Sequence, residues 1–317
     1  MNKKHIATAG IIGVILMVLV CAATVGLRMI GTKEQKNEPT ETTQVMKDIT
    51  VLAMAIDAPL DSNCGKLSLL YKEEVENLSD GNLSIEIYEN GILGNSEELI
   101  STIGSDSNAA DIILAPISIL AEAGCEQTSK IKTLFANHKD FSTWAISKET
   151  EALFAEPNKS GVGAEGLFFC EEGFNRLFLA DNDTPMQGKV IAGRASDSSR
   201  LYIESLGCIY TYLPAIDIKT AIEKGEIDGV ERDYHFYKDN ELWGETPYIV
   251  DGLNLVTPYE ALIKINTLET LSSNDLLLLR NAGKNVITHF ENMIIEEDAS
   301  LENEFKDHGA VFAPLKE

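Results

Sequence analysis

The chain contains 317 residues, 44% of them hydrophobic, which is enough apolar material for one large domain or for two lobes with separate cores. Its formal net charge of −24 argues against nucleic-acid binding, because phosphate recognition needs clustered lysines and arginines that the sequence lacks. None of its five cysteines has metal-ligand spacing, so we expect no metal site, and Cys64, Cys125, Cys170 and Cys208 are either paired or buried as free thiols.

The N-terminal segment, residues 1–30, is an apolar stretch that follows two lysines and carries no charge between Ile6 and Leu27. A helix of about 20 apolar residues is long enough to cross a membrane, and basic residues before it favour export of the chain that follows. We expect an uncleaved signal anchor, with two alternatives: cleavage after Ala23 as a signal peptide, or lipidation at Cys21.

The next part of the chain is a polar segment, residues 31–47, whose lack of apolar periodicity predicts a flexible tether. A folded domain, residues 48–317, comes after it. Hydrophobic periodicity predicts a strand, a helix, a strand, a helix with Ser96 as its N-cap, and a strand over residues 49–56, 67–78, 83–87, 96–103 and 110–115. This alternation predicts a parallel sheet covered by helices.

The second strand and the loop after it carry a spaced set of glycine, apolar and polar residues: Ser79, Gly81, Leu83, Ile85, Ile87, Tyr88, Gly91, Leu93, Gly94 and Glu98. The spacing resembles a signature of the solute-binding proteins of tripartite ATP-independent periplasmic (TRAP) transporters. Leu134-Phe135 is similar to another segment of that family, with Thr133 in place of the usual proline.

Two short apolar runs, residues 163–169 and 173–179, are separated by Cys170-Glu171-Glu172. In the TRAP family the chain crosses here into the second lobe and reaches an element whose arginine often lines the ligand pocket. Gly173-Phe174-Asn175-Arg176 resembles that element with one residue inserted. The resemblance therefore implies that Arg176 contacts the ligand.

Residues 187–231 predict a strand and two helices, over residues 190–195, 199–206 and 216–224, and then a turn at Asp228-Gly229. Their order resembles the TRAP pattern, but the strand arginine of the family falls on Ala192 and its asparagine falls on Arg232. Arg194 lies two residues beyond Ala192, on the same face of a strand. A guanidinium there can hold a carboxylate through two parallel hydrogen bonds.

The last third of the chain contains an aromatic segment, an apolar strand over residues 247–255, a long helix and a short strand over residues 310–313. We expect the long helix to begin at Ser272 or Ser273, with Asp275 in its first turn and without a Glu or Gln capping box. These elements also resemble the closing elements of the TRAP binding proteins, so the resemblance covers residues 49–315.

Six residues are the candidate ligand contacts: Arg194, Arg176, Arg232, Tyr234, Tyr237 and Trp243. Each has a structural alternative. The arginines would pair with neighbouring acids, such as Asp197 for Arg194 and Asp228, Glu231 or Asp233 for Arg232, and the aromatic residues would pack in a core. The histidines are scattered, and nucleophile elbows, Walker A lysines and dinucleotide fingerprints are absent, so we expect no enzyme and no cofactor.

The resemblance implies an α/β, two-lobed fold of the type II periplasmic-binding-protein class, with a hinge and a long late helix, preceded by an N-terminal signal or transmembrane helix. Lobe 1 is expected over about 49–168 and 252–295, and lobe 2 over about 169–251 and 296–317. The implied protein is extracytoplasmic, either tethered to the cytoplasmic membrane or released if its N-terminal segment is cleaved. It would capture a small organic carboxylate and deliver it to TRAP permease subunits; the alternative is a membrane-tethered ligand sensor or interaction protein with the same fold.

Overall fold

The computed structural model describes residues 49–182, 184–252 and 254–315. The expected signal helix and tether lie outside these residues. Within them, no helix combines the length and the hydrophobicity of a membrane span.

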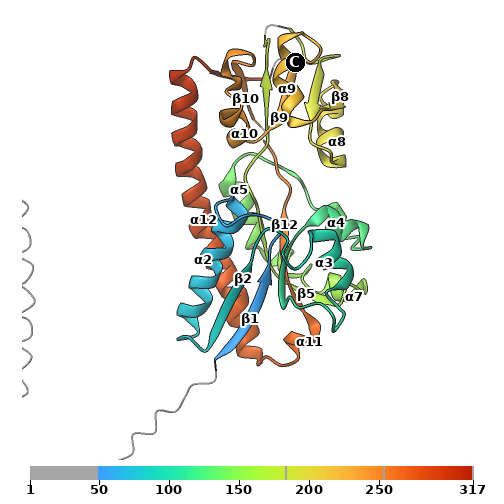
Figure 1. The fold of residues 1–317 in the computed structure, drawn as a ribbon, viewed down its shortest axis with the longest axis vertical. Coiled ribbons are helices and arrows are strands. Elements are labelled where there is room, and N and C mark those ends of the chain that lie inside the picture. Colours follow the sequence, from blue (N-terminus) through green and yellow to red (C-terminus); the bar gives the residue numbers. More distant parts are fainter. Residues whose placement is uncertain (1–48, 183, 253, 316–317) are drawn as a thin grey trace, which may run out of the picture. The chain divides into compact units, whose positions relative to one another are not determined.

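The first sheet contains five strands in the order β2-β1-β3-β12-β5, which span Leu83–Tyr88, Thr50–Ala55, Ile112–Pro116, Tyr259–Lys264 and Ala164–Cys170. Strand β1 pairs in parallel with β2 and with β3, which confirms the parallel arrangement expected from the alternating strands and helices. Strand β12 runs antiparallel to both β3 and β5. A late part of the chain therefore completes a sheet that begins at residue 50 (Figure 1).

Helices flank this sheet, and they span Asn63–Leu78 (α2), Ser96–Thr102 (α3), Ile117–Glu122 (α4), His138–Ala145 (α5), Lys148–Glu151 (α6), Glu156–Lys159 (α7) and Ile265–Leu268 (α11), with a 3-10 turn at Thr128–Lys130 (η1). The N-cap of α3 is Asn95, which forms a capping box with Glu98, so the expectation of Ser96 as the cap was wrong. The Ser96 amide and hydroxyl instead donate hydrogen bonds to Asp57.

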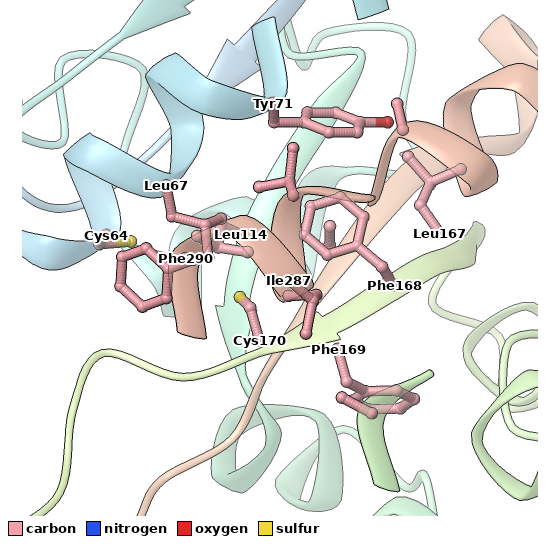
Figure 2. Close-up of a cluster of buried hydrophobic side chains, with 14 of the residues drawn as sticks. Cys64, Leu67, Tyr71, Leu114, Leu167, Phe168, Phe169, Cys170, Ile287 and Phe290 are labelled. Carbon is pink, nitrogen blue, oxygen red and sulfur yellow. The ribbon is translucent and has the colours of Figure 1, made fainter. Parts of the chain in front are cut away.

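The core of the first sheet is aromatic as well as aliphatic (Figure 2). Tyr71 of α2 packs on Phe168 of β5 with ring centroids 4.7 Å apart, and Ile287 and Phe290 come from the long helix α12, Ser273–Asp307. Helix α12 begins after Ser272, whose side chain forms a capping box with Asp275. We expected no capping box here. One forms because the cap is Ser272 and because Asp275 takes the place of the usual glutamate.

The second sheet contains six strands in the order β13-β10-β6-β9-β7-β8, which span Val311–Pro314, Tyr248–Asp251, Arg176–Leu179, Gly229–Arg232, Val190–Gly193 and Ile209–Tyr212. Its helices span Asp197–Ser205 (α8), Ala215–Glu223 (α9) and Tyr234–Asp239 (α10), with a 3-10 turn at Leu242–Gly244 (η2). Leu301 and Phe305, near the end of α12, pack into the core of this sheet. The long helix thus contributes to both cores (Figure 1).

The chain passes between the two sheets in the segments 171–175 and 252–258 and along α12. These crossings are joined to one another. Strands β4 (Leu134–Phe135) and β11 (Asn254–Leu255) form a small antiparallel ladder, and the Asn175 amide donates to the Leu255 carbonyl at 2.8 Å. We propose that the two sheets mark the two lobes, with bounds close to those expected from the sequence, and that these crossings form the hinge.

The four cysteines among the described residues, Cys64, Cys125, Cys170 and Cys208, are all free and buried. Burial is the largest influence on each thiol and raises its pKa. They therefore behave as small apolar core residues with low reactivity.

One buried carboxyl in the first sheet lacks any compensation. Glu260 of β12 is 0% exposed, and neither of its oxygens has a hydrogen-bond partner among the described residues. Burial raises its pKa well above the ordinary value of 4.5, and the charge of Glu156 raises it further. A folded-state pKa above the unfolded value favours the neutral form, so ionisation adds no cost below pH 4.5 and an increasing one as the pH rises above 4.5.

We therefore expect Glu260→Met, an unbranched apolar replacement, to stabilise the fold by about 1 to 3 kcal/mol at pH 8 and by less at pH 5. Urea unfolding at the two pH values measures the difference. Glu269→Met removes a similar charge from an exposed position and serves as the control. A destabilised Glu260→Met at pH 8 would show that the carboxyl has a partner that the geometry does not reveal.

Candidate functional site

A cavity of about 100 Å³ lies where the crossing segments meet the two sheets. Its walls combine residues of α2, of the start of α10, of the crossings and of α12 with the residue that follows β7: Asn63, Glu172, Gly173, Phe174, Asn175, Arg194, Asp233, Tyr234, His235, Thr257, Ile294 and Asp298. We call it the crossing cavity. Because its lining comes from segments far apart in the sequence, only the folded chain assembles it.

Two larger cavities adjoin the crossing cavity by sharing lining residues with it. One, of about 350 Å³, shares Glu172 and lies against the ends of β1 and β3, where Asp57 and Pro116 line it. The other, of about 840 Å³, shares Thr257 and is lined by α4, by η1 and by the start of α8. Together they offer a small molecule more room than the crossing cavity alone.

Arg194 is the arginine of the crossing cavity, and it directly follows β7. Its guanidinium donates to the Thr257 hydroxyl at 3.1 Å, and its Nε lies 3.7 Å from a carboxylate oxygen of Glu231. The Arg194 side chain is 32% exposed, whereas Glu231 is fully buried. A guanidinium that is partly exposed and has five N–H donors can bind an anion beside these contacts.

Glu231 orients this arginine from within the second sheet. Its carboxylate accepts the Ser199 hydroxyl at 2.5 Å and the Arg194 backbone amide at 3.2 Å. Burial, the largest influence, raises the pKa of Glu231, and the charge of Arg194 opposes that shift. The sequence alternative of an Arg194–Asp197 pair is not seen, because Asp197 pairs with Arg200 at 2.7 Å.

Arg176 is held by α12. Its guanidinium forms an ion pair with Asp298 at 2.8 Å and lies 3.8 Å from the centroid of the Tyr234 ring. The Arg176 side chain is 11% exposed and does not appear in the wall of the crossing cavity. Contacts within the protein therefore already neutralise the charge of Arg176 and occupy its guanidinium.

Asp298 also binds a second cation, His138, at the start of α5. His138 contacts Asp298 at 3.1 Å and Glu171 at 2.9 Å through its two ring nitrogens, and it stacks on Phe174. Although burial lowers the pKa of His138, hydrogen bonds and charges from Asp298 and Glu171 outweigh it and raise the pKa to about 9. This buried network of Arg176, His138, Glu171 and Asp298 ties α5, α12 and the first crossing together.

Glu172, the residue after Glu171, takes part in a different set of contacts. Its carboxylate accepts the Tyr259 hydroxyl at 2.8 Å and the Cys64 thiol, both neutral donors. Burial raises the pKa of Glu172, and the charge of Asp233 raises it further, whereas the charge of Arg194 lowers it. Glu172, Arg194 and Asp233 thus influence one another electrostatically across the crossing cavity.

The model of the bacterial extracellular solute-binding protein family 7 (DctP) matches residues 54–317. The chain belongs to this family. No curated protein matches the chain.

Solved structures of TRAP periplasmic solute-binding proteins share the fold of this family 7 chain. An apo open structure from Rhodobacter sphaeroides has a TM-score of 0.73 at 14% identity, covering 84% of this chain and 86% of that one. A structure from Xanthobacter autotrophicus with bound β-D-galacturonate has a TM-score of 0.62 at 19% identity, with 84% and 89% covered. One from Pseudomonas putida with bound D-glucuronate has a TM-score of 0.62 at 14% identity, with 84% and 88% covered.

Of the six residues that the sequence suggests as ligand contacts of this family 7 protein, two line the crossing cavity. Arg194 and Tyr234 line the crossing cavity. Arg232 is 8% exposed, donates to the Glu231 carbonyl at 2.7 Å and lies outside the lining. Tyr237 stacks on Phe178 and Trp243 stacks on His308, so both belong to the core of the second sheet.

Several lining residues were not singled out from the sequence, above all Glu172, Asp233 and Thr257. For Glu172, the sequence offered one signal: two adjacent acids, Glu171 and Glu172, stand between two apolar runs. Asp233 is the N-cap of α10 and accepts the Phe236 amide at 2.8 Å, so its local role gave no hint of the cavity.

Proposed function

We propose that the protein binds a small organic acid between its two lobes and delivers it to the membrane subunits of a TRAP-type transporter. The observation that supports this most is Arg194, a guanidinium on the wall of a cavity lined by both crossings and by helices that flank both sheets. Closure over a ligand would exclude water from the cavity and strengthen the contact between Arg194 and a carboxylate.

The family relatives support the same ligand class. The Xanthobacter autotrophicus and Pseudomonas putida proteins hold galacturonate and glucuronate, which are both carboxylates. The TM-score is higher for the apo open relative than for these two complexes, 0.73 against 0.62, which supports an open arrangement of the lobes in this chain. An open form with a hinge is what a protein that must load its ligand requires.

The protein would act outside the cytoplasm. A family 7 protein is extracytoplasmic, and the apolar segment of residues 1–30 would hold it at the outer face of the cytoplasmic membrane, next to its permease. Genes for the small and large membrane subunits beside this one would support transport, and a neighbouring receptor kinase would instead indicate a sensor.

Isothermal titration calorimetry of the full chain in a non-ionic detergent tests the binding step. We expect a saturable signal for at least one member of a panel of organic acids that includes galacturonate and glucuronate, and none for neutral sugars. Chemical analysis of the recovered ligand should show it unchanged. Binding of neutral sugars alone, or conversion of the ligand, would overturn the proposal.

A further inference from the structure

The crossing cavity is acidic, which is unusual for a site that binds an acid. Three carboxylates line it, those of Glu172, Asp233 and Asp298, together with Arg194 and His235. Asp298 is neutralised by Arg176 and His138. Glu172 and Asp233 form no ion pair with any described lysine or arginine, so two acidic side chains without such a partner line the space that Arg194 also lines.

Neither adjoining cavity relieves this charge imbalance. The one that shares Glu172 is lined by Asp57 and Glu97 and by no described lysine or arginine. The one that shares Thr257 contains Glu97, Glu122 and Asp197 with Arg200, which is already paired with Asp197. A ligand with a second anionic group would therefore meet acids in both adjoining cavities, where Arg200 is the one described arginine or lysine.

The contacts of Glu172 keep a carboxylate available rather than neutralise it. Its donors are the Tyr259 hydroxyl and the Cys64 thiol, which orient the group but carry no positive charge. Burial makes that charge costly without a cation, and a ligand cation would remove the cost. The same cation would also be attracted by Asp233, whose charge reaches Glu172.

We propose that the ligand is a zwitterion, an organic acid that also carries an ammonium or similar cationic group, with Arg194 binding its carboxylate and Glu172, assisted by Asp233, binding its cation. This inference rests on the proposed function and narrows its ligand class. It explains why a family 7 protein whose crossing cavity has one arginine can keep two acids without ion-pair partners beside it.

Matched pairs of ligands test the inference by calorimetry on the full chain. Each pair has the same carboxylate and differs only in an amino or a hydroxyl group: L-alanine and L-lactate, 4-aminobutyrate and 4-hydroxybutyrate, and 2-amino-2-deoxy-galacturonate and galacturonate. We expect the amino member of at least one pair to bind tenfold or more tightly than its hydroxyl partner. Glu172→Gln should reduce that ratio at least tenfold, and Glu226→Gln, at an exposed position, should leave it unchanged.

The outcomes separate this inference from the proposed function. If hydroxy acids bind as tightly as their amino partners, or if Glu172→Gln does not change the ratio of the two dissociation constants, the ligand is not a zwitterion. The proposal that the protein binds an organic acid would stand in either case. Failure of every acid to bind would overturn both. Should Glu172→Gln fold poorly, Asp233→Asn provides the same ratio test, because asparagine also serves as an N-cap for α10.

Discussion

Replacing Arg194 with alanine is expected to weaken binding of the organic acid by a factor of about 30 to 3,000. Removing one partner of a hydrogen-bonded charge pair in a desolvated site costs about 2 to 5 kcal/mol, and 1.4 kcal/mol is a factor of ten. Arg194→Ala also leaves the buried Glu231 without its nearest cation, so its folding must be checked by circular dichroism. Calorimetry with the best ligand of the panel gives the ratio of dissociation constants.

Two further variants make the Arg194 result specific. Arg194→Lys keeps the charge but loses the planar fork, so we expect a smaller loss of affinity than for alanine. Lys224→Ala removes a cation from an exposed position outside the crossing cavity and both adjoining cavities, and should bind like the wild type. Equal affinities for Arg194→Ala and the wild type would remove Arg194 from the site and with it the main support for the proposed function.

Replacing Asp298 with alanine is expected to destabilise the fold by about 3 to 5 kcal/mol, because it leaves two buried cations without their shared acceptor. Arg176 and His138 both contact the same Asp298 oxygen, at 2.8 and 3.1 Å. Glu296→Ala removes an exposed acid from the same helix and should change the free energy of unfolding by less than about 0.5 kcal/mol. Urea unfolding measures both.

The effect of Asp298→Ala should depend on pH in a defined direction. The pKa of His138 is raised from 6.5 to about 9, so its charged form contributes stability in full below pH 6.5 and loses it as pH rises through about 9. The difference in unfolding free energy between wild type and Asp298→Ala should therefore be larger at pH 7 than at pH 10. A difference that is equal at the two pH values would show that His138 is not charged in the native network.

Local patterns predicted much of the fold because they depend on nearby residues. Alternation and helical spacing gave the strands and helices of the first sheet, and β1 pairs in parallel with β2 and β3 as expected. The caps were less predictable, since Asn95 and Ser96 are both good N-caps and only the chain path selects one. The antiparallel insertion of β12 depends on contacts between distant segments, which no local pattern contains.

The site was harder to predict than the fold for the same reason. Arg176 was expected at the ligand from its resemblance to a family element, yet its partner Asp298 lies 122 residues further along the chain. Tyr234, Tyr237 and Trp243 are equivalent candidates in the sequence, but only Tyr234 lines the crossing cavity, whereas Tyr237 is buried against Phe305 of α12 and Trp243 packs against the second core. Arg194 stays a prediction whose placement in the crossing cavity now has a geometry to test.

The 35 residues of α12 form one continuous helix, about 50 Å long, that is anchored at both ends by different cores. Its apolar contacts with the first core end at Ile294 and those with the second begin at Leu301, and between them the ionic contacts of Glu297 and Asp298 hold the helix. If the two sheets close on a ligand as proposed, α12 must bend or rotate between its two apolar anchors. Ionic contacts tolerate small rotations better than interlocked side chains, so we expect the segment around Asp298 to take up that movement.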